Sequence, residues 1–121
     1  TRESRATGLS GRTRIPDDGG MLFVYPQPQS LVFWMYLCLV DIDVAFLDPQ
    51  GRVLAVYEMQ AEPPPGPGES PGAYRQRLKR YQSPQPGQFA LELRAGSLRE
   101  LGIQVGDKLD LPLAELVRQA R

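Results

Sequence analysis

The stretch Leu31–Asp48, LVFWMYLCLVDIDVAFLD, is the longest apolar run in the chain and contains its only Trp and its only Cys. Eighteen residues exceed the length of a usual β-strand, so we predict a bend or bulge inside the run, at about residues 38–41. Asp41 and Asp43 interrupt the run, and two charges in its middle argue against a membrane span. The run therefore predicts the centre of a hydrophobic core, and no transmembrane segment.

Turn and strand signals surround this run. Asp48–Gly51 (DPQG) has Pro at the second position and Gly at the fourth, as in a tight turn. Val53–Met59 (VLAVYEM) follows it, so we predict an antiparallel hairpin with the second half of the run. Further short strands are predicted at residues 21–25, 89–94 and 108–111. With twelve Gly and twelve Pro in the chain, the pattern is mainly β and predicts a small antiparallel β-sandwich or barrel.

Three helices are predicted around the strands: a short N-terminal helix at residues 1–12, a small helix near Leu98, and a C-terminal helix at residues 113–120. Ser97 and Glu100 have the spacing of a capping box, and Gly102 is expected to end the small helix. Residues 60–73, QAEPPPGPGESPGA, contain no large apolar side chain and predict an exposed loop inserted into the domain. We predict that residues 1–121 form one domain.

Composition narrows the classes of function. Fourteen basic and fourteen acidic residues give a net charge of zero, so no overall field favours nucleic acid or a membrane as a partner. The local basic cluster Tyr74–Tyr81 (YRQRLKRY) is interpreted as a solvated face, with a nucleic-acid backbone as the alternative. The chain has no His, which removes the commonest general base and a common zinc ligand. No cofactor motif or metal-ligand spacing is present, so we expect neither a cofactor nor a metal.

Several motifs resemble, in this order along the chain, the prokaryotic family known as domain of unknown function 192. They include Gly20–Tyr25 (GMLFVY), Phe33–Met35 (FWM), Asp43–Asp48 (DVAFLD), Leu91–Leu93 (LEL) and Gly106-Asp107. The resemblance implies a β-sandwich or barrel-like domain that is often exported or lipid-anchored. We therefore expect an extracytoplasmic prokaryotic protein, with any signal segment absent from this chain. The family has no established activity, so the resemblance supplies no mechanism.

The chain departs from the family pattern in two ways. Tyr36-Leu37-Cys38 stands where the family usually has Lys-Asn-Thr, and Asp41 stands where Pro is common. The family also usually has an edge strand before the opening helix, and this chain begins without one. An unpaired sheet edge would offer a surface for a homo-oligomer.

The leading hypothesis for function is a non-catalytic binding module for a small polar ligand or a protein partner. Its candidate residues are Arg12, Trp34, Tyr36 and Asp43, which combine charge with aromatic surface. The alternative is a hydrolase or lyase acting on a carbohydrate or cell-wall component, with acid and base drawn from Asp41, Asp43 and Glu92. Asp41 and Asp43 share one face of a strand, roughly 7 Å apart. Their simplest role is solvation, a backbone hydrogen bond or an ion pair with Arg12.

Overall fold

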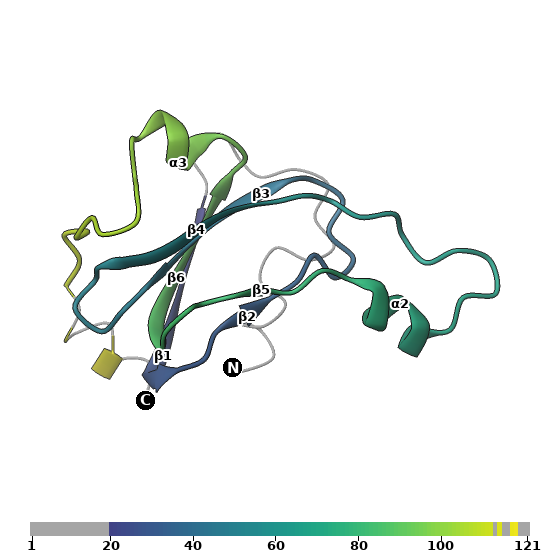
Figure 1. Ribbon diagram of the computed structural model, residues 1–121, viewed down its shortest axis with the longest axis horizontal. Helices are drawn as coiled ribbons and strands as arrows, with labels where there is room; N and C mark the ends of the chain where they lie inside the picture. The colour runs from purple at the N-terminus through teal and green to yellow at the C-terminus, as the bar shows by residue number, and fades with distance from the viewer. Residues whose placement is uncertain (1–19, 113, 115–116, 119–121) are drawn as a thin grey trace.

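The computed structural model describes residues 20–112, 114, 117 and 118 (Figure 1). Four antiparallel strands form the main sheet, in the order β1-β6-β3-β4, and two more form a small second sheet. The main-sheet strands are β1 (Gly20–Gln29), β3 (Ile42–Leu47), β4 (Val53–Met59) and β6 (Gly87–Arg94). The second sheet pairs β2 (Val32–Phe33) with β5 (Tyr81–Gln82), and α2 (Pro71–Arg77) and α3 (Ser97–Glu100) are helices within residues 20–112.

Two apolar layers cover the two faces of the main sheet. On one face, which we call the β2–β5 face, the Phe33 ring packs edge-on against Phe23 and Phe46, with centroids 5.4 and 5.2 Å apart. On the other face, the α3 face, Leu98 packs with Leu47 and other buried side chains. The mainly β, antiparallel prediction is therefore confirmed. Among the described residues the strands do not close into a barrel, because β1 and β4 are separate sheet edges.

The predicted hairpin is confirmed. β3 pairs with β4 in antiparallel register, and all six residues of β3 are buried because β6 flanks its other side. In the connecting turn, Asp48 Oδ1 accepts hydrogen bonds from the amides of Gln50 and Arg52, both at 2.9 Å. Gly51 has φ 83°, a left-handed conformation that glycine adopts without steric cost. Side chain and backbone thus fix the register of β3 and β4.

The run from Leu31 to Asp48 is interrupted as predicted, but its turn precedes the predicted residues 38–41, and its two halves belong to different sheets. β2 ends at Phe33, a turn follows at Tyr36 and Leu37, and β3 starts at Ile42. Leu37 has φ 51°, which is rare for a residue with a Cβ atom. Its amide donates a hydrogen bond to the Tyr74 hydroxyl at 2.9 Å, so α2 supports the turn.

The small helix near Leu98 is confirmed, but its start is not the predicted capping box. Gly96 occupies the N-cap position with φ 87°, and no side chain of the helix caps it. The Leu98 amide instead donates to Asp43 Oδ2 on β3, at 3.1 Å. Gly102 ends the helix as predicted: its amide bonds to Arg99 O, and the Ile103 amide bonds to Leu98 O, both at 3.0 Å. These two bonds form a Schellman motif.

The structure differs from the predictions for the loop at residues 60–73 and the strand at residues 108–111. α2 begins at Pro71, within the loop predicted at residues 60–73, because Ser70 Oγ caps it by accepting from the Ala73 amide at 3.1 Å. The predicted strand at 108–111 is reduced to a single bridge between Arg52 and Lys108.

The predicted N-terminal helix lies outside the described residues, and the predicted C-terminal helix is described only at residues 114, 117 and 118, which are helical. In the described part of the chain, no helix is long and apolar enough to span a membrane.

Candidate functional site

Asp43 is the most deeply buried acidic residue that the structure describes. It lies in the middle of the sheet on the α3 face, and only 1% of its surface is exposed. Its Oδ2 accepts the hydrogen bond from the Leu98 amide, whereas its Oδ1 has no hydrogen-bond partner among the described residues. A buried polar atom without a partner costs about 1–3 kcal/mol, and more when it is charged. The unpaired oxygen therefore marks a place where a donor would bind favourably.

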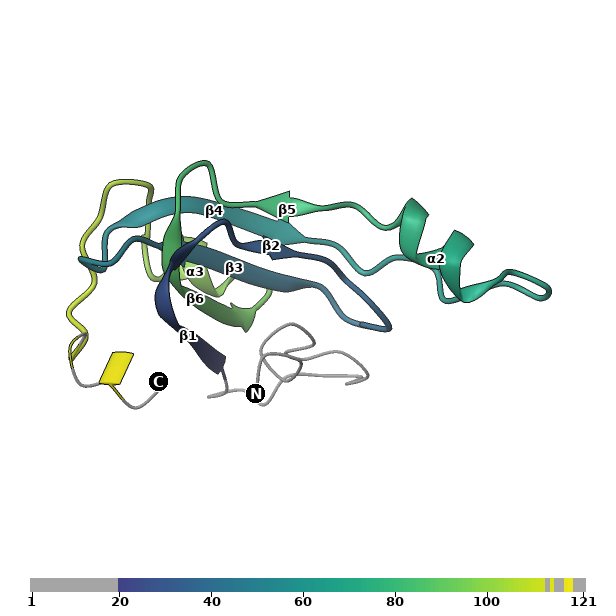
Figure 2. The ribbon, with the colours of Figure 1, turned by 90° about the horizontal axis from the view of Figure 1, so that it is seen from below.

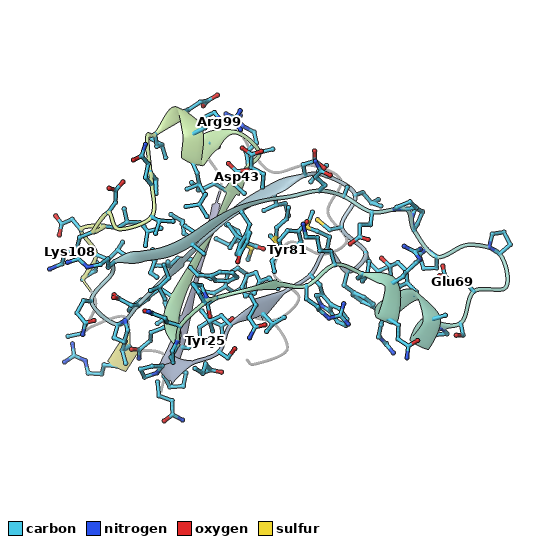
Figure 3. The ribbon with its side chains drawn as sticks, viewed as in Figure 1. Tyr25, Asp43, Glu69, Tyr81, Arg99 and Lys108 are labelled. Atoms are coloured by element: carbon cyan, nitrogen blue, oxygen red, sulfur yellow. The ribbon has the colours of Figure 1, made fainter. Side chains whose placement is uncertain are left out.

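Two cavities flank Asp43, beside α3. Figure 3 shows where the side chains of Asp43 and Arg99 lie. Their volumes are about 260 and 240 Å³, and Asp43, Glu58 and Arg99 line both of them. The larger is also lined by Asp41, Met59, Gln60, Ala95 and Gly96. The smaller is also lined by Val56, Leu98, Gly102, Ile103 and Gln104. Both are therefore recesses at the junction of β3, β4 and α3.

An ion pair between Arg99 and Glu58 lies at these cavities. Glu58 lies opposite Asp43 in the β3–β4 register, so both side chains are on the α3 face. The side chains of Arg99 and Glu58 are 78% and 57% exposed, and such surface pairs contribute at most about 1 kcal/mol. The larger cavity thus has three carboxylates, those of Asp41, Asp43 and Glu58, against one guanidinium. Its potential favours a cationic ligand.

Asp41 and Asp43 line one cavity, in agreement with the strand alternation predicted from the sequence. Asp41 is exposed, and its Oδ1 accepts a hydrogen bond from the Ala61 amide at 2.8 Å. Glu92 lies elsewhere: it pairs with Val44 in the β3–β6 register, whereas Asp43 pairs with Leu93. Adjacent positions alternate between faces, so Glu92 is buried on the β2–β5 face and cannot share a substrate with Asp43.

Cys38 has the environment of a core residue. Its side chain belongs to the cluster on the β2–β5 face, and its Sγ donates to the Val40 carbonyl at 3.4 Å. Burial raises the pKa of the Cys38 thiol, which disfavours the nucleophilic thiolate. The structure therefore gives Cys38 a packing role in the core.

The aromatic candidates gather at a second place, beside α2. Trp34 and Tyr36 are stacked, with ring centroids 5.5 Å apart and planes at 23°. Both follow β2, which covers the β2–β5 face of the sheet, whereas Asp43 points to the α3 face. Arg12 lies outside the described residues. The structure therefore brings Trp34 and Tyr36 together but does not bring Asp43 to them.

Sequence reasoning missed two residues of the Asp43 site. Glu58 could have been predicted from the sequence, because the predicted hairpin places it across from Asp43. Arg99 could not, because its position depends on α3 folding back over β3 through the bond between the Leu98 amide and Asp43.

Comparison with known proteins places this architecture in a family. A solved structure of a "putative transcription regulator" from Sinorhizobium meliloti 1021 is similar at 27% identity and a TM-score of 0.71, covering 91% of this chain and 75% of that one. A protein of unknown function from Novosphingobium aromaticivorans DSM 12444 is similar at 27% identity and a TM-score of 0.72, covering 92% of this chain and 70% of that one. No curated protein matches the chain. The DUF192 family model, described as "Uncharacterized ACR", matches residues 1–111, and the chain therefore belongs to the DUF192 family.

Proposed function

We propose that this protein is a non-catalytic binding module, and that its site is the pair of cavities at Asp43. The ligand is a small organic cation, such as a protonated amine with a short apolar body. The observation that carries the proposal is the buried Oδ1 of Asp43, which has no hydrogen-bond partner among the described residues and belongs to a side chain that lines both cavities.

An ammonium group fits this oxygen in charge and in hydrogen bonding. It has three donors and no acceptor, so it can satisfy Asp43 Oδ1 directly. A hydrogen bond between two charged groups is about twice as strong as one between neutral groups. The carboxylates of Asp41 and Glu58 would add attraction at the same cavity. A neutral alcohol of the same length lacks this electrostatic term and should bind more weakly.

The volume and the lining residues of the cavities limit the size and the polarity of the ligand. A volume of about 260 Å³ equals the space of roughly nine water molecules in the liquid, at about 30 Å³ each. At the smaller cavity, the side chains of Val56, Leu98 and Ile103 supply apolar wall for an alkyl chain. Among the described residues, no three acidic or sulfur side chains are grouped to hold one metal ion. These features favour a short alkylamine over a divalent cation.

The test is an NMR titration of the backbone amides with butylamine, using 1-butanol as the uncharged control. Butylamine should shift the signals of residues 96–104 with a Kd on the order of 1 mM, the range available to a ligand of five heavy atoms. The signals should move much less with 1-butanol. Equal shifts with the two compounds, or shifts only at distant residues, would contradict the proposal.

Two variants separate the roles of the charges. Asp43→Asn keeps an oxygen that can accept from the Leu98 amide but removes the anion, so butylamine binding should weaken about 10-fold to 100-fold. Arg99→Gln removes the competing cation at the mouth, so binding should tighten, by up to about fivefold. An Asp43→Asn protein that binds butylamine like the wild type would show that this carboxylate is not the anchor.

A second function, a hydrolase or lyase acting on a carbohydrate, is favoured by one observation: Asp41 and Asp43 line the same cavity. Two carboxylates on one substrate are the common requirement of glycoside hydrolysis. This alternative predicts release of reducing ends from peptidoglycan by the wild-type protein, and loss of that release in both Asp41→Asn and Asp43→Asn. Absence of release by the wild type would remove it.

A further inference from the structure

A second surface, distinct from the Asp43 site, lies where β2 meets α2. We call it the aromatic–arginine surface: it consists of Trp34, Tyr36, Arg75 and Arg80, and it lies over the buried ring of Tyr74. The Tyr36 ring contacts Trp34 at 5.5 Å and Tyr74 at 5.6 Å between centroids. The Arg80 guanidinium lies 4.2 Å from the Trp34 ring centroid, and that of Arg75 lies 5.6 Å from the Tyr36 centroid. Rings and cations therefore form one continuous array.

Hydrogen bonds hold the Arg80 side chain of this array in place. Arg80 donates from Nη1 to Leu78 O at 2.6 Å and from Nη2 to Arg75 O at 3.0 Å, which leaves its other N–H groups available. Within the described part of the chain, neither Arg75 nor Arg80 has a salt bridge. Arg77 differs, because it is engaged by Glu69 and by the carbonyl of Pro63. The guanidinium groups of Arg75 and Arg80 are therefore not neutralised by an acidic side chain of the described residues.

Exposed aliphatic side chains accompany these cations. Val32, Leu37 and Leu39 are 48%, 41% and 51% exposed, and they come from the same short segment as Trp34 and Tyr36. Large exposed aliphatic side chains grouped in one segment indicate an interaction surface. Figures 1 and 2 both show α2 and the Pro-rich loop extending away from the main sheet, with the β2–β3 connection reaching toward the same end. The surface is therefore accessible to a broad, flat partner.

We propose that the aromatic–arginine surface docks onto an anionic phospholipid bilayer. The guanidinium groups of Arg75 and Arg80 would bind lipid phosphates, and the exposed aliphatic side chains would enter the interfacial layer. Trp and Tyr suit that layer because each joins an apolar ring to a polar group. An acidic peptide would satisfy the cations without covering the leucines. A nucleobase would have to stack on Trp34, over which Tyr36 and Arg80 already lie.

The chain carries its own reporter for this proposal, because Trp34 is its only tryptophan. Vesicles of phosphatidylglycerol should shift the tryptophan emission of the full chain to shorter wavelength, and added salt should reverse the shift. Vesicles of phosphatidylcholine, which carry no net charge, should leave the emission nearly unchanged. No shift with phosphatidylglycerol, or an equal shift with both lipids, would overturn the proposal.

Matched variants locate the contact. Arg75→Gln and Arg80→Gln should each weaken partition onto phosphatidylglycerol by about fivefold, the usual contribution of one basic residue near an anionic membrane. Leu39→Ser should weaken it as well. Lys108→Gln should not, because Lys108 is exposed and lies away from α2 (Figure 3). Leu101→Ser should not either, because Leu101 is exposed at the end of α3 (Figure 1). Equal losses in the controls would overturn the assignment. So would a Trp34 emission change with single-stranded DNA or polyglutamate but none with vesicles.

Discussion

The turn at Leu37 allows a sharp test of how the longest apolar run is divided between two sheets. Leu37 has φ 51°, a conformation that places the Cβ atom too close to the following carbonyl oxygen. Replacing Leu37 by Ala keeps this strain, whereas replacing it by Gly removes it. Both variants lose the same leucine side chain, so their difference isolates the backbone term.

At position 37 we expect the Gly variant to be more stable than the Ala variant, which is the reverse of their order in regular secondary structure. In the left-handed region a residue with a Cβ atom is less stable than Gly by about 1 kcal/mol. In regular structure Gly is instead less stable than Ala by about 0.5–1 kcal/mol. Leu37→Gly should therefore exceed Leu37→Ala in free energy of unfolding by about 1 kcal/mol, or about 4 °C in Tm for a chain of this size. Leu37→Asn, which introduces the residue usual in the family, should also exceed Leu37→Ala.

The assay is urea unfolding at equilibrium, with Ala73→Gly as the matched control. Ala73 is an exposed residue of α2, where the same exchange should lower the free energy of unfolding by about 0.5–1 kcal/mol. Opposite signs at the two positions would support the turn as described. If Leu37→Ala is as stable as Leu37→Gly, the left-handed turn between β2 and β3 is wrong.

Two further predictions concern packing and the Pro-rich loop. At Gly87 an added Cβ would lie 2.8 Å from Cδ1 of Leu31, so Gly87→Ala should destabilise the protein by about 1–3 kcal/mol in urea unfolding. Gly72→Ala, in open space on α2, should not destabilise it. The hydrogen bond from Arg77 lowers the pKa of Glu69 from 4.5 to about 2. The lowered pKa means that this attachment of the loop to α2 is fully present above pH 4.5 and is lost as the pH falls through about 2. Glu69→Gln should abolish that pH dependence in the NMR shifts of the loop amides.

Local signals in the sequence were sufficient to predict the β3–β4 hairpin and the end of α3. The β3–β4 hairpin follows from a turn motif between two apolar runs, and the end of α3 follows from Gly102. α2 was missed because its first residues, Pro71 and Gly72, were read as loop composition. Ser70 followed by Pro71 is nevertheless an N-cap and first-turn signal, and its side chain does cap the helix.

The remaining features depend on contacts between residues distant in sequence. The capping box was wrong because Gly96, not Ser97, is the N-cap: the Glu100 amide, expected to bond to Ser97 Oγ, bonds to Gly96 O. Asp43, 55 residues before Leu98, accepts instead from the Leu98 amide. For the same reason the array of Trp34 and Arg80 could not be predicted from local pattern, since it requires β2 to pair with β5. Alternation along β3 did place Asp41 and Asp43 at one cavity. Alternation within one strand cannot relate Asp43 to Glu92, because that relation depends on the β3–β6 register.

The central claim is that the Asp43 carboxylate binds a cation in the cavities beside α3. The most direct measurement is the butylamine titration followed at the Leu98 amide, whose hydrogen is held by the other oxygen of the same carboxylate. The account predicts a saturable shift of this signal with butylamine, which is absent with 1-butanol and strongly weakened in Asp43→Asn. A Leu98 signal that does not move with butylamine, or that moves equally in Asp43→Asn, would contradict it.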